Sequence, residues 1–289
     1  MKLIMTLLVR DESDIIAANI DFHRAMGVDF FIVTDNLSND NTASILHRYE
    51  QNGILHYIHE SDDDYAQHRW VTRMARMAAT RFAADWVINN DADEFWWPER
   101  GDLKSTLASI DPAADAVSAN RQNFVPIAME PGAFFAEFMT IREVQSLNAL
   151  GRPLPAKVCH RAYADIEVDQ GNHSVKRNAK PMAPVPGPIS ILHFPQRAYE
   201  QFENKIAKGG AAYIRNTYLP ENIGATWRHL YDIWRRGELR RYYEQSLPST
   251  AELQQGLESG QLVRDERLKR FFELRTGPRH AGSQYESTP

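Results

Sequence analysis

The feature that most constrains the fold is a strand, helix and strand that follow one another near the amino terminus. Residues 3–9 form a near-continuous apolar run, which is typical of a strand buried on both faces of a parallel sheet. A helical pattern that starts near Ser13 or Asp14 and ends at Gly27 is followed by a second apolar strand at residues 30–33. This βαβ unit predicts an α/β fold with a mixed, mainly parallel sheet flanked by helices.

An acidic motif follows a further apolar strand centred on Val87. Asp91, Asp93 and Glu94 come directly after this strand and lead into the aromatic run 95–97. Ligands bind beyond the carboxyl ends of strands in such sheets, and carboxylate oxygens suit a hard divalent cation. If the segment is extended, Asp91 and Asp93 point to the same side and can share one metal. The alternative is a solvated acidic turn, which the aromatic neighbours disfavour.

Composition excludes several classes of protein. The 289 residues carry a net charge of -5, which argues against a dedicated nucleic-acid binder. The single cysteine, Cys159, forms no intrachain disulfide and is compatible with a reducing compartment. The apolar run at the amino terminus is short and breaks into charges, and no stretch approaches the ~20 apolar residues of a membrane span. We expect a cytoplasmic protein, at most associated with the inner face of the membrane.

The carboxyl-terminal third has a helical pattern. Helices are predicted at residues 199–208 and 227–246, with a break at Gly209 and Gly210. Their arginines and aromatic residues either lie on an anionic membrane surface or pack on the core or on a second subunit, and we favour packing. The expected domains are residues 1–196, a helical extension at 197–276 and a disordered tail at 277–289. Residues 176–188 are rich in proline and predict an irregular loop or lid.

A helix predicted from about residue 65 to residue 84 carries a basic stripe. Arg69, Arg73 and Arg76 are spaced i, i+4 and i+7, which places them on one helix face. Such a stripe is either a solvated surface or a contact for a diphosphate, with which arginine forms bidentate pairs. The sequence leaves both interpretations open.

Four segments resemble, in order, the signatures of GT-A fold glycosyltransferases similar to families 2 and 92. They are residues 6–12 (TLLVRDE), 23–29 (HRAMGVD), 34–42 (TDNLSNDNT) and 91–95 (DADEF). Residues 192–197 (LHFPQR), with Glu200, Gln201 and Lys205, are similar to the end of that domain. The resemblance implies transfer of a sugar, with inversion, from a nucleotide-sugar donor, a UDP-sugar first of all, to a hydroxyl of a glycan or glycolipid. It also implies a divalent cation, Mn2+ or Mg2+.

The resemblance and the basic stripe together name the candidate site residues. Metal ligands would be Asp91 and Asp93 of the Asp-x-Asp motif together with His193. Donor contacts would come from Arg10, Glu12, Asp35, Gln67, Arg69, Arg73, Asp91, His173 and Lys205.

An inverting transfer also needs one general base. The family places an acid between the Asp-x-Asp motif and the last strand, and Asp169 is our choice because a turn at residues 171–173 follows it. Glu167 and the acids near Glu143 are the alternatives. The acidic pair that marks the base in family 2 is not recognisable in this chain, and the loop at residues 38–42 lacks the glycine that relatives often carry.

Two rival functions are a sugar-phosphate nucleotidyltransferase and a sugar- or nucleotide-binding module that has lost its catalysis. The first would open with a glycine-rich basic loop after the first strand, and residues 10–13 are Arg-Asp-Glu-Ser instead. The presence of Asp91, Asp93 and His193 together argues against the second.

Overall fold

The computed structural model describes residues 1–63, 67–130, 132–216 and 224–276. These residues form two compact units, one of residues 1–121 and 155–192, the other of residues 122–154 and those from 193 on. The predicted boundary at residue 196 lies close to one of these divisions, but residues 122–154 also group with the carboxyl-terminal segment. The tail predicted to be disordered, residues 277–289, lies outside the described residues.

The first unit contains most of the strands. Its elements are β1 (Leu3–Val9), α1 (Ile16–Ala25), β2 (Phe30–Asn36), α2 (Thr42–Gln51), β3 (Leu55–Glu60), α3 (Gln67–Thr80), β4 (Trp86–Asn90), β5 (Glu94–Pro98), α4 (Leu103–Ala108), β6 (Ala116–Asn123), β8 (Lys157–Arg161), β9 (Ile166–Val168), η1 (Gln170–Asn172), β10 (Val175–Arg177), β11 (Lys180–Pro181) and β12 (Val185–His193). The last residues of β6 and β12 belong to the second unit.

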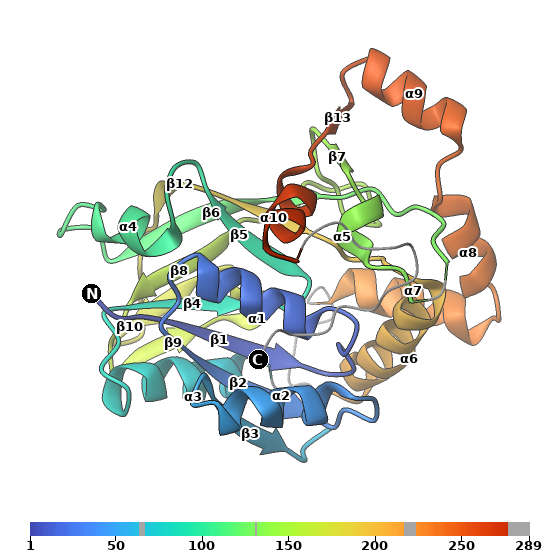
Figure 1. The fold of residues 1–289 in the computed structure, drawn as a ribbon. Helices are drawn as coiled ribbons and strands as arrows, with labels where there is room; N and C mark the ends of the chain where they lie inside the picture. Colours follow the sequence, from blue (N-terminus) through green and yellow to red (C-terminus); the bar gives the residue numbers. More distant parts are fainter. Residues whose placement is uncertain (64–66, 131, 217–223, 277–289) are drawn as a thin grey trace. The chain divides into compact units, whose positions relative to one another are not determined.

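An eight-stranded sheet has the order β3-β2-β1-β4-β8-β6-β12-β5 (Figure 1). Strand β1 pairs in parallel with β2 and with β4, and β2 pairs in parallel with β3. Strand β8 is antiparallel to both of its neighbours, β4 and β6. The expected α/β fold with a mixed, mainly parallel sheet is therefore confirmed.

Helices cover both faces of the parallel part of the sheet. On one face, Val71 and Met74 of α3 pack in a buried cluster with Ile4, Ile32 and Val87, which come from β1, β2 and β4. Right-handed crossovers place α1 and α2 on the opposite face, because the strand order runs outward from β1 to β3 and then returns to β4. Apolar side chains on both strand faces explain the near-continuous apolar runs.

This topology brings the carboxyl ends of β1, β2 and β4 to one edge of the sheet. Val9 of β1 lies opposite Asp35 of β2, and Leu7 of β1 lies opposite Asn90 of β4. The loops that follow these three strands therefore share one edge. They contain Glu12 and Asp91, two of the predicted site residues.

Residues 176–188 form strands for the most part, so the predicted loop or lid is wrong. They contribute to β10, to β11 and to the first half of β12. Pro181 lies in β11, at the edge of a three-stranded sheet with β10 and β9, where a missing N–H group costs no ladder hydrogen bond. Pro188 still accepts a hydrogen bond through its carbonyl, from the Glu99 N–H at 2.9 Å.

The second unit is mainly helical. It contains α5 (Phe135–Phe138), β7 (Ile141–Glu143), α6 (Tyr199–Arg215), α7 (Ala225–Arg235), α8 (Leu239–Ser246), α9 (Thr250–Glu258), β13 (Leu262–Arg264) and α10 (Arg267–Thr276). Aromatic residues of α6, α7 and α8 pack around a cluster that includes Phe202, Leu230 and Tyr243. No helix in the described ranges has both the length and the apolar character to cross a bilayer.

The predicted helix break at Gly209 and Gly210 is wrong, because α6 runs through both glycines. A Cβ atom on Gly209 would lie 2.5 Å from the Trp227 ring, and one on Gly210 would lie 2.5 Å from Tyr231. These two glycines therefore allow α7 to pack closely on α6, a tertiary reason for glycine that overrides its low helix propensity.

Candidate functional site

The loops after β1 and β2 are tied together by hydrogen bonds. Asp11 donates its N–H to Ser38 Oγ at 2.9 Å and accepts from the Asn39 N–H at 2.7 Å. The Glu12 N–H donates to Thr42 Oγ1 at 2.9 Å. Polar residues that sequence patterns assign to turns and helix caps thus connect two loops at the edge of the sheet.

Asp35, predicted to line the nucleotide pocket, is 1% exposed and shapes its own loop. Its carboxylate accepts hydrogen bonds from the Ser38 N–H at 3.1 Å and from the Tyr57 hydroxyl at 3.0 Å. Burial and the neighbouring Asp35 raise the pKa of Tyr57 to about 12, so this hydroxyl stays a donor. Asp35 therefore positions the end of β2.

Arg10 and Glu12 follow β1 at the same edge. The Arg10 guanidinium pairs with Asp63 at 2.7 Å, while its buried Nε atom has no hydrogen-bond acceptor among the residues that the structure describes. Glu12 is 8% exposed. A buried donor without an acceptor is rare in folded proteins, so Arg10 Nε marks a position where a ligand oxygen would be accommodated.

The acidic motif forms a turn between β4 and β5, and the expectation of an extended segment is wrong. The Glu94 N–H donates to the Asp91 carbonyl at 3.1 Å, which closes the turn. The Asp91 side chain is 31% exposed, whereas Asp93 and Glu94 are buried. The two aspartates therefore differ in exposure, and Asp91 is the one that solvent or a ligand can reach.

A buried polar network of residues from α1, β4 and β5 supports this turn. The Asn19 amide donates to the carbonyls of Ala92 at 2.9 Å and Glu94 at 2.8 Å. Trp96 donates its indole N–H to Asn90 Oδ1 at 2.9 Å, and the Asn90 amide donates to the Glu94 carbonyl at 3.1 Å. Trp96 is fully buried, so it fills the core and is not available for stacking on a sugar.

Two cations face the acidic turn. Lys157 Nζ lies 2.5 Å from Asp91 Oδ2 and 3.2 Å from Glu94 Oε1, and the Lys157 side chain is only 1% exposed. Arg121 lies 3.6 Å from Glu94 Oε1. Burial raises the pKa of Glu94 to about 7, against the lowering effect of Lys157. The acidic turn and its two cations thus form a largely buried cluster of positive and negative side chains.

Asn172 and the predicted donor contact His173 follow each other in the chain near Asp91. Asn172 of η1 donates its amide to Asp91 Oδ1 at 3.3 Å, and His173 follows it, with Nδ1 2.9 Å from the Ala156 carbonyl. Burial, then Lys157 and Arg121, lower the pKa of His173 to about 4, so the ring is neutral near pH 7.

Gln67, at the start of α3, belongs to the same region. Its Oε1 atom accepts from the Gly171 N–H of η1 at 3.2 Å, which joins the start of α3 to the 3-10 turn. The structure therefore groups Gln67, His173 and Asp91 around η1.

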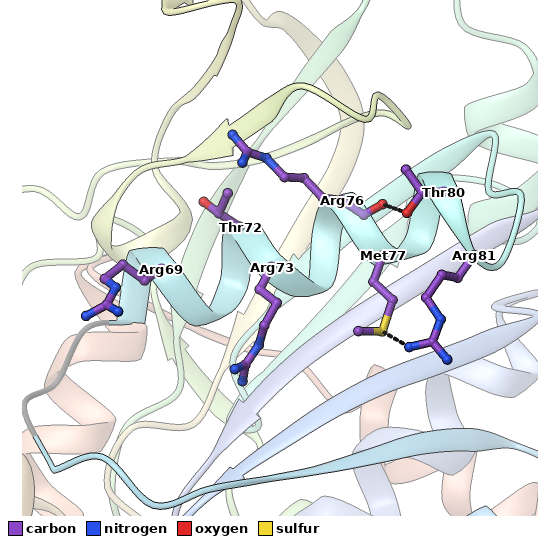
Figure 2. Close-up of a pocket in the computed structure, with 7 residues that line it drawn as sticks. All are labelled: Arg69, Thr72, Arg73, Arg76, Met77, Thr80 and Arg81. Carbon is purple, nitrogen blue, oxygen red and sulfur yellow. Dashed lines mark hydrogen bonds between the residues drawn. The ribbon is translucent and has the colours of Figure 1, made fainter.

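The arginines of α3 diverge. Figure 2 shows Arg73 and Arg76 leaving the helix in opposite directions. Arg73 pairs with Glu60 of β3 at 2.9 Å, and Arg76 donates to the Ile166 carbonyl at 2.7 Å. A surface hollow of about 500 Å³ along α3 is lined by Arg69, Thr72, Arg73, Arg76, Met77, Thr80 and Arg81. The stripe therefore does not converge on one diphosphate, although Arg69 lies in the first turn of α3, close in sequence to Gln67.

The predicted base, Asp169, is ion-paired. Its carboxylate accepts from the Ser174 hydroxyl at 2.5 Å and from Lys176 at 2.8 Å. Burial opposes ionisation, but these two bonds outweigh it and keep the pKa of Asp169 below its usual range. The alternative, Glu167, lies 3.7 Å from Arg76 with its side chain 48% exposed.

In the second unit, His193 ends a short polar chain. Its Nδ1 atom lies 2.7 Å from Asn123 Oδ1, and the Asn123 amide donates to Glu143 Oε2 at 3.3 Å. Burial raises the pKa of Glu143, against hydrogen bonds from Leu147 and Asn123. Lys205 lies on α6, with its ammonium 6.0 Å from the Trp227 ring centroid.

The residues of the acidic turn fit a hard divalent cation that a ligand helps to hold. In the part of the chain that the structure describes, no three acidic, histidine or cysteine side chains are arranged to bind a metal by themselves. Among the described residues, Glu94 Oε2 is nevertheless buried without a hydrogen bond, while Oε1 is ion-paired with Lys157 and Arg121; the side-chain ligand atoms of the acidic turn are all oxygens. Mg2+ and similar ions commonly bind one or two carboxylates together with substrate phosphates. The acidic turn can supply the carboxylates.

Lys157, Arg121, Asn19 and Asn172 are the residues that sequence reasoning missed. The only local signal is a lysine that opens the apolar segment Lys157-Val158-Cys159. A charged residue in a buried strand is seldom unpaired, but its partner cannot be named from the segment itself.

Two buried histidines make stability sensitive to acid. Burial lowers the pKa of His23 to about 3 and that of His160 to about 4. Below pH 6.5 the unfolded chain takes up protons that the folded chain refuses, so the free energy of unfolding falls by about 1.4 kcal/mol per pH unit for each histidine. The contribution of these two histidines to the free energy of unfolding is thus fully present above pH 6.5 and is lost as the pH falls toward 4.

Urea unfolding at pH 7 and pH 5 tests this. We expect the stability loss between these two values to be about 2 kcal/mol smaller in His160→Gln than in the wild type. His47→Gln is the control, because His47 is half-exposed. An equal loss in wild type and His160→Gln would contradict the assignment.

The chain is similar to several known proteins. Residues 5–141 match the model described as glycosyltransferase family 92. No curated protein matches the chain closely enough to count as a relative. Among solved structures, S. aureus TarS 1–349 in complex with UDP is 16% identical, with coverage of 76% of this chain and 68% of that one and a TM-score of 0.43.

Two other solved structures are similar at the same distant level. Mannosyltransferase PcManGT from Pyrobaculum calidifontis, in complex with GDP-Man and Mn2+, is 15% identical over 90% of this chain and 79% of that one, with a TM-score of 0.39. Glucosyl-3-phosphoglycerate synthase from Mycobacterium tuberculosis, in complex with Mn2+, UDP and phosphoglyceric acid, is 20% identical over 42% of this chain and 43% of that one, with a TM-score of 0.32.

Proposed function

We propose that this chain, which is a glycosyltransferase with a GT-A fold, transfers a sugar from a nucleotide-sugar donor to a hydroxyl of a glycan or glycolipid. The family 92 match over residues 5–141 is the premise. The proposal includes a divalent cation, Mn2+ or Mg2+, and inversion at the transferred sugar. A UDP-sugar is the first donor to test.

One observation carries the proposal. The acidic turn lies at the carboxyl end of β4, at the edge where β1 and β2 also end, and it presents the partly exposed Asp91 between Lys157 and Asn172. Ligands of α/β sheets bind beyond this edge. A diphosphate at Asp91 would meet Lys157 as a counter-ion, and the nucleoside would extend toward Arg10 and Glu12.

The proposed metal ligands in the first unit are Asp91 and Asp93, and His193 stays the third ligand that the family resemblance implies. When bound, the cation would act as a Lewis acid that neutralises charge on the departing nucleoside diphosphate. The Asn172 amide orients the Asp91 carboxylate, and the Asn19 amide holds the backbone of the turn through the Ala92 carbonyl. The neutral His173 would donate a hydrogen bond to the nucleotide-sugar donor or accept one from it.

Two carboxylates are candidates for the general base. Asp169 is the acid that sequence reasoning selects, but Lys176 and Ser174 occupy its carboxylate and its pKa is low. The pKa of Glu143 is raised, which brings a carboxylate closer to the value that proton abstraction near pH 7 requires. Glu143 is also linked through Asn123 to His193. We favour Glu143.

A thermal-shift panel of nucleoside diphosphates and nucleotide sugars, each with Mn2+ and with EDTA, tests the donor site. A ligand that binds only the folded state raises stability by mass action, so we expect one nucleotide to raise the melting temperature with Mn2+ and to do so far less with EDTA. Transfer of radiolabelled sugar from that donor to water or to a glycan mixture then tests catalysis. Absence of any nucleotide-dependent shift would contradict the proposal and favour the decayed module.

A further inference from the structure

We propose that Lys157 is the resident cation of the donor site: its ammonium neutralises the acidic turn in the free protein, weakens metal binding there, and passes to the donor diphosphate when the nucleotide binds. This inference rests on the proposed function, because it assigns a role within the same site. Lys157 is a positioning residue for the acidic turn and, in the donor complex, a contact for phosphate oxygens.

Lys157 is a buried lysine. It opens β8, lies opposite Ala119 of β6, and its side chain is 1% exposed. Lysine is almost never fully buried unless it is paired, since removing an ammonium from water costs several kcal/mol. A buried ion pair is often no more stabilising than an apolar pair of the same size. Fold stability alone therefore gives a weak reason for a lysine at this position.

The Lys157 ammonium lies against two carboxylates of the acidic turn. Lys157 Nζ lies 2.5 Å from Asp91 Oδ2 and 3.2 Å from Glu94 Oε1, so it bridges the two ends of the turn. This is where a cation shared by the same carboxylates would lie. A divalent ion that binds Asp91 must therefore compete with the ammonium for the same oxygen. The chain therefore carries its own cation against Asp91, one of the two aspartates proposed to bind the metal.

The Lys157 side chain is able to change partners. Its ammonium has three donors on a flexible four-carbon stem, which can be re-aimed without moving the strand. Asp91 is 31% exposed, so the pair is accessible from the solvent side of the turn. A diphosphate that arrives there offers charged oxygens, and charge-assisted hydrogen bonds to phosphate are strong. Metal and diphosphate would then bind together more tightly than either does alone.

Calorimetric titration of the full chain with Mn2+, in the absence of nucleotide, tests this inference. We expect Lys157→Met to bind Mn2+ at least about tenfold more tightly than the wild type, because the competing cation is gone. We expect the same variant to bind UDP in the presence of EDTA at least about tenfold more weakly. Lys104→Met is the matched control: Lys104 pairs with Asp29 at 2.6 Å, outside the acidic turn, and its loss should change neither affinity.

A second pair of variants covers the case in which Lys157→Met does not fold, since it leaves buried carboxylates without a partner. The double variant Lys157→Met/Glu94→Gln loses one positive and one negative side chain. It is compared with the single variant Glu94→Gln. The double variant should bind Mn2+ about tenfold more tightly than the single one. Equal Mn2+ affinities in either comparison would overturn the role of Lys157. If wild type binds no nucleotide even with Mn2+, the proposed function fails instead, whatever the variants show.

Discussion

Asp91→Asn should lower kcat/KM for sugar transfer by at least about 100-fold, the scale seen when one charge-stabilising group is lost from an active site. Asp91 is the acidic side chain of the turn that a ligand can reach, at 31% exposure, whereas Asp93 is buried. The amide keeps the shape of the side chain but loses the charge that a divalent cation requires. Initial rates at saturating and at low donor, with Mn2+, measure the effect.

The fold of the Asp91→Asn variant should survive. Lys157 keeps its second partner, Glu94, at 3.2 Å, and the network of Asn19 and Trp96 does not involve the Asp91 carboxylate. Asp85→Asn is the control, because Asp85 lies just before the other end of β4, its side chain is 56% exposed, and its carboxylate contacts the amino-terminal residues Met1 and Lys2. Wild-type turnover in Asp91→Asn, or an equal loss in Asp85→Asn, would remove Asp91 from the site.

Glu143→Gln should keep donor binding and lose transfer by about 100-fold or more, the usual contribution of a general base. The glutamine can still accept the hydrogen bonds from Asn123 and Leu147, so the local structure should be retained. UDP-dependent thermal shifts with Mn2+ measure binding, and single-turnover rates measure transfer. A fall in rate without a fall in affinity identifies a group that acts on the acceptor.

Asp169→Asn is the matched variant for this test. We expect it to retain transfer within about threefold, because a carboxylate held by Lys176 and Ser174 is a weak base. The opposite result, loss of transfer in Asp169→Asn with normal turnover in Glu143→Gln, would return the base to Asp169. The pH dependence of the rate is a further measurement. A variant without the general base should no longer show the fall in rate at low pH that protonation of the base causes.

The basic stripe of α3 shows why helical spacing alone did not locate the donor. Arg69, Arg73 and Arg76 share a helix face by position, but long side chains follow their nearest acceptors. Arg73 turns to Glu60 of β3 and Arg76 to the β9 backbone (Figure 2). The spacing of Cα atoms therefore did not determine where the guanidinium groups lie.

Gly209 and Gly210 show the same limit for secondary structure. Two adjacent glycines predict a helix break from local entropy, yet α6 continues because Trp227 and Tyr231 need the space that a Cβ atom would occupy. The proline-rich residues 176–188 form strands for the most part, and Pro181 lies in β11 at the edge of its sheet, where its nitrogen needs no ladder partner. In both cases the tertiary surroundings, not the local residue preference, decided the outcome.

The sequence by itself determined the βαβ start, the buried strand that ends in Asp91, and the placement of acidic residues at one edge of a parallel sheet. These features follow from local apolar patterns and from the rule that parallel strands end at the same edge. Only the tertiary structure decided that Asp91 is exposed while Asp93 is buried, and that Lys157 lies against the turn. Lys157 is 66 residues from Asp91 along the chain, and antiparallel pairing of β8 with β4 brings them together, a contact that no local pattern encodes.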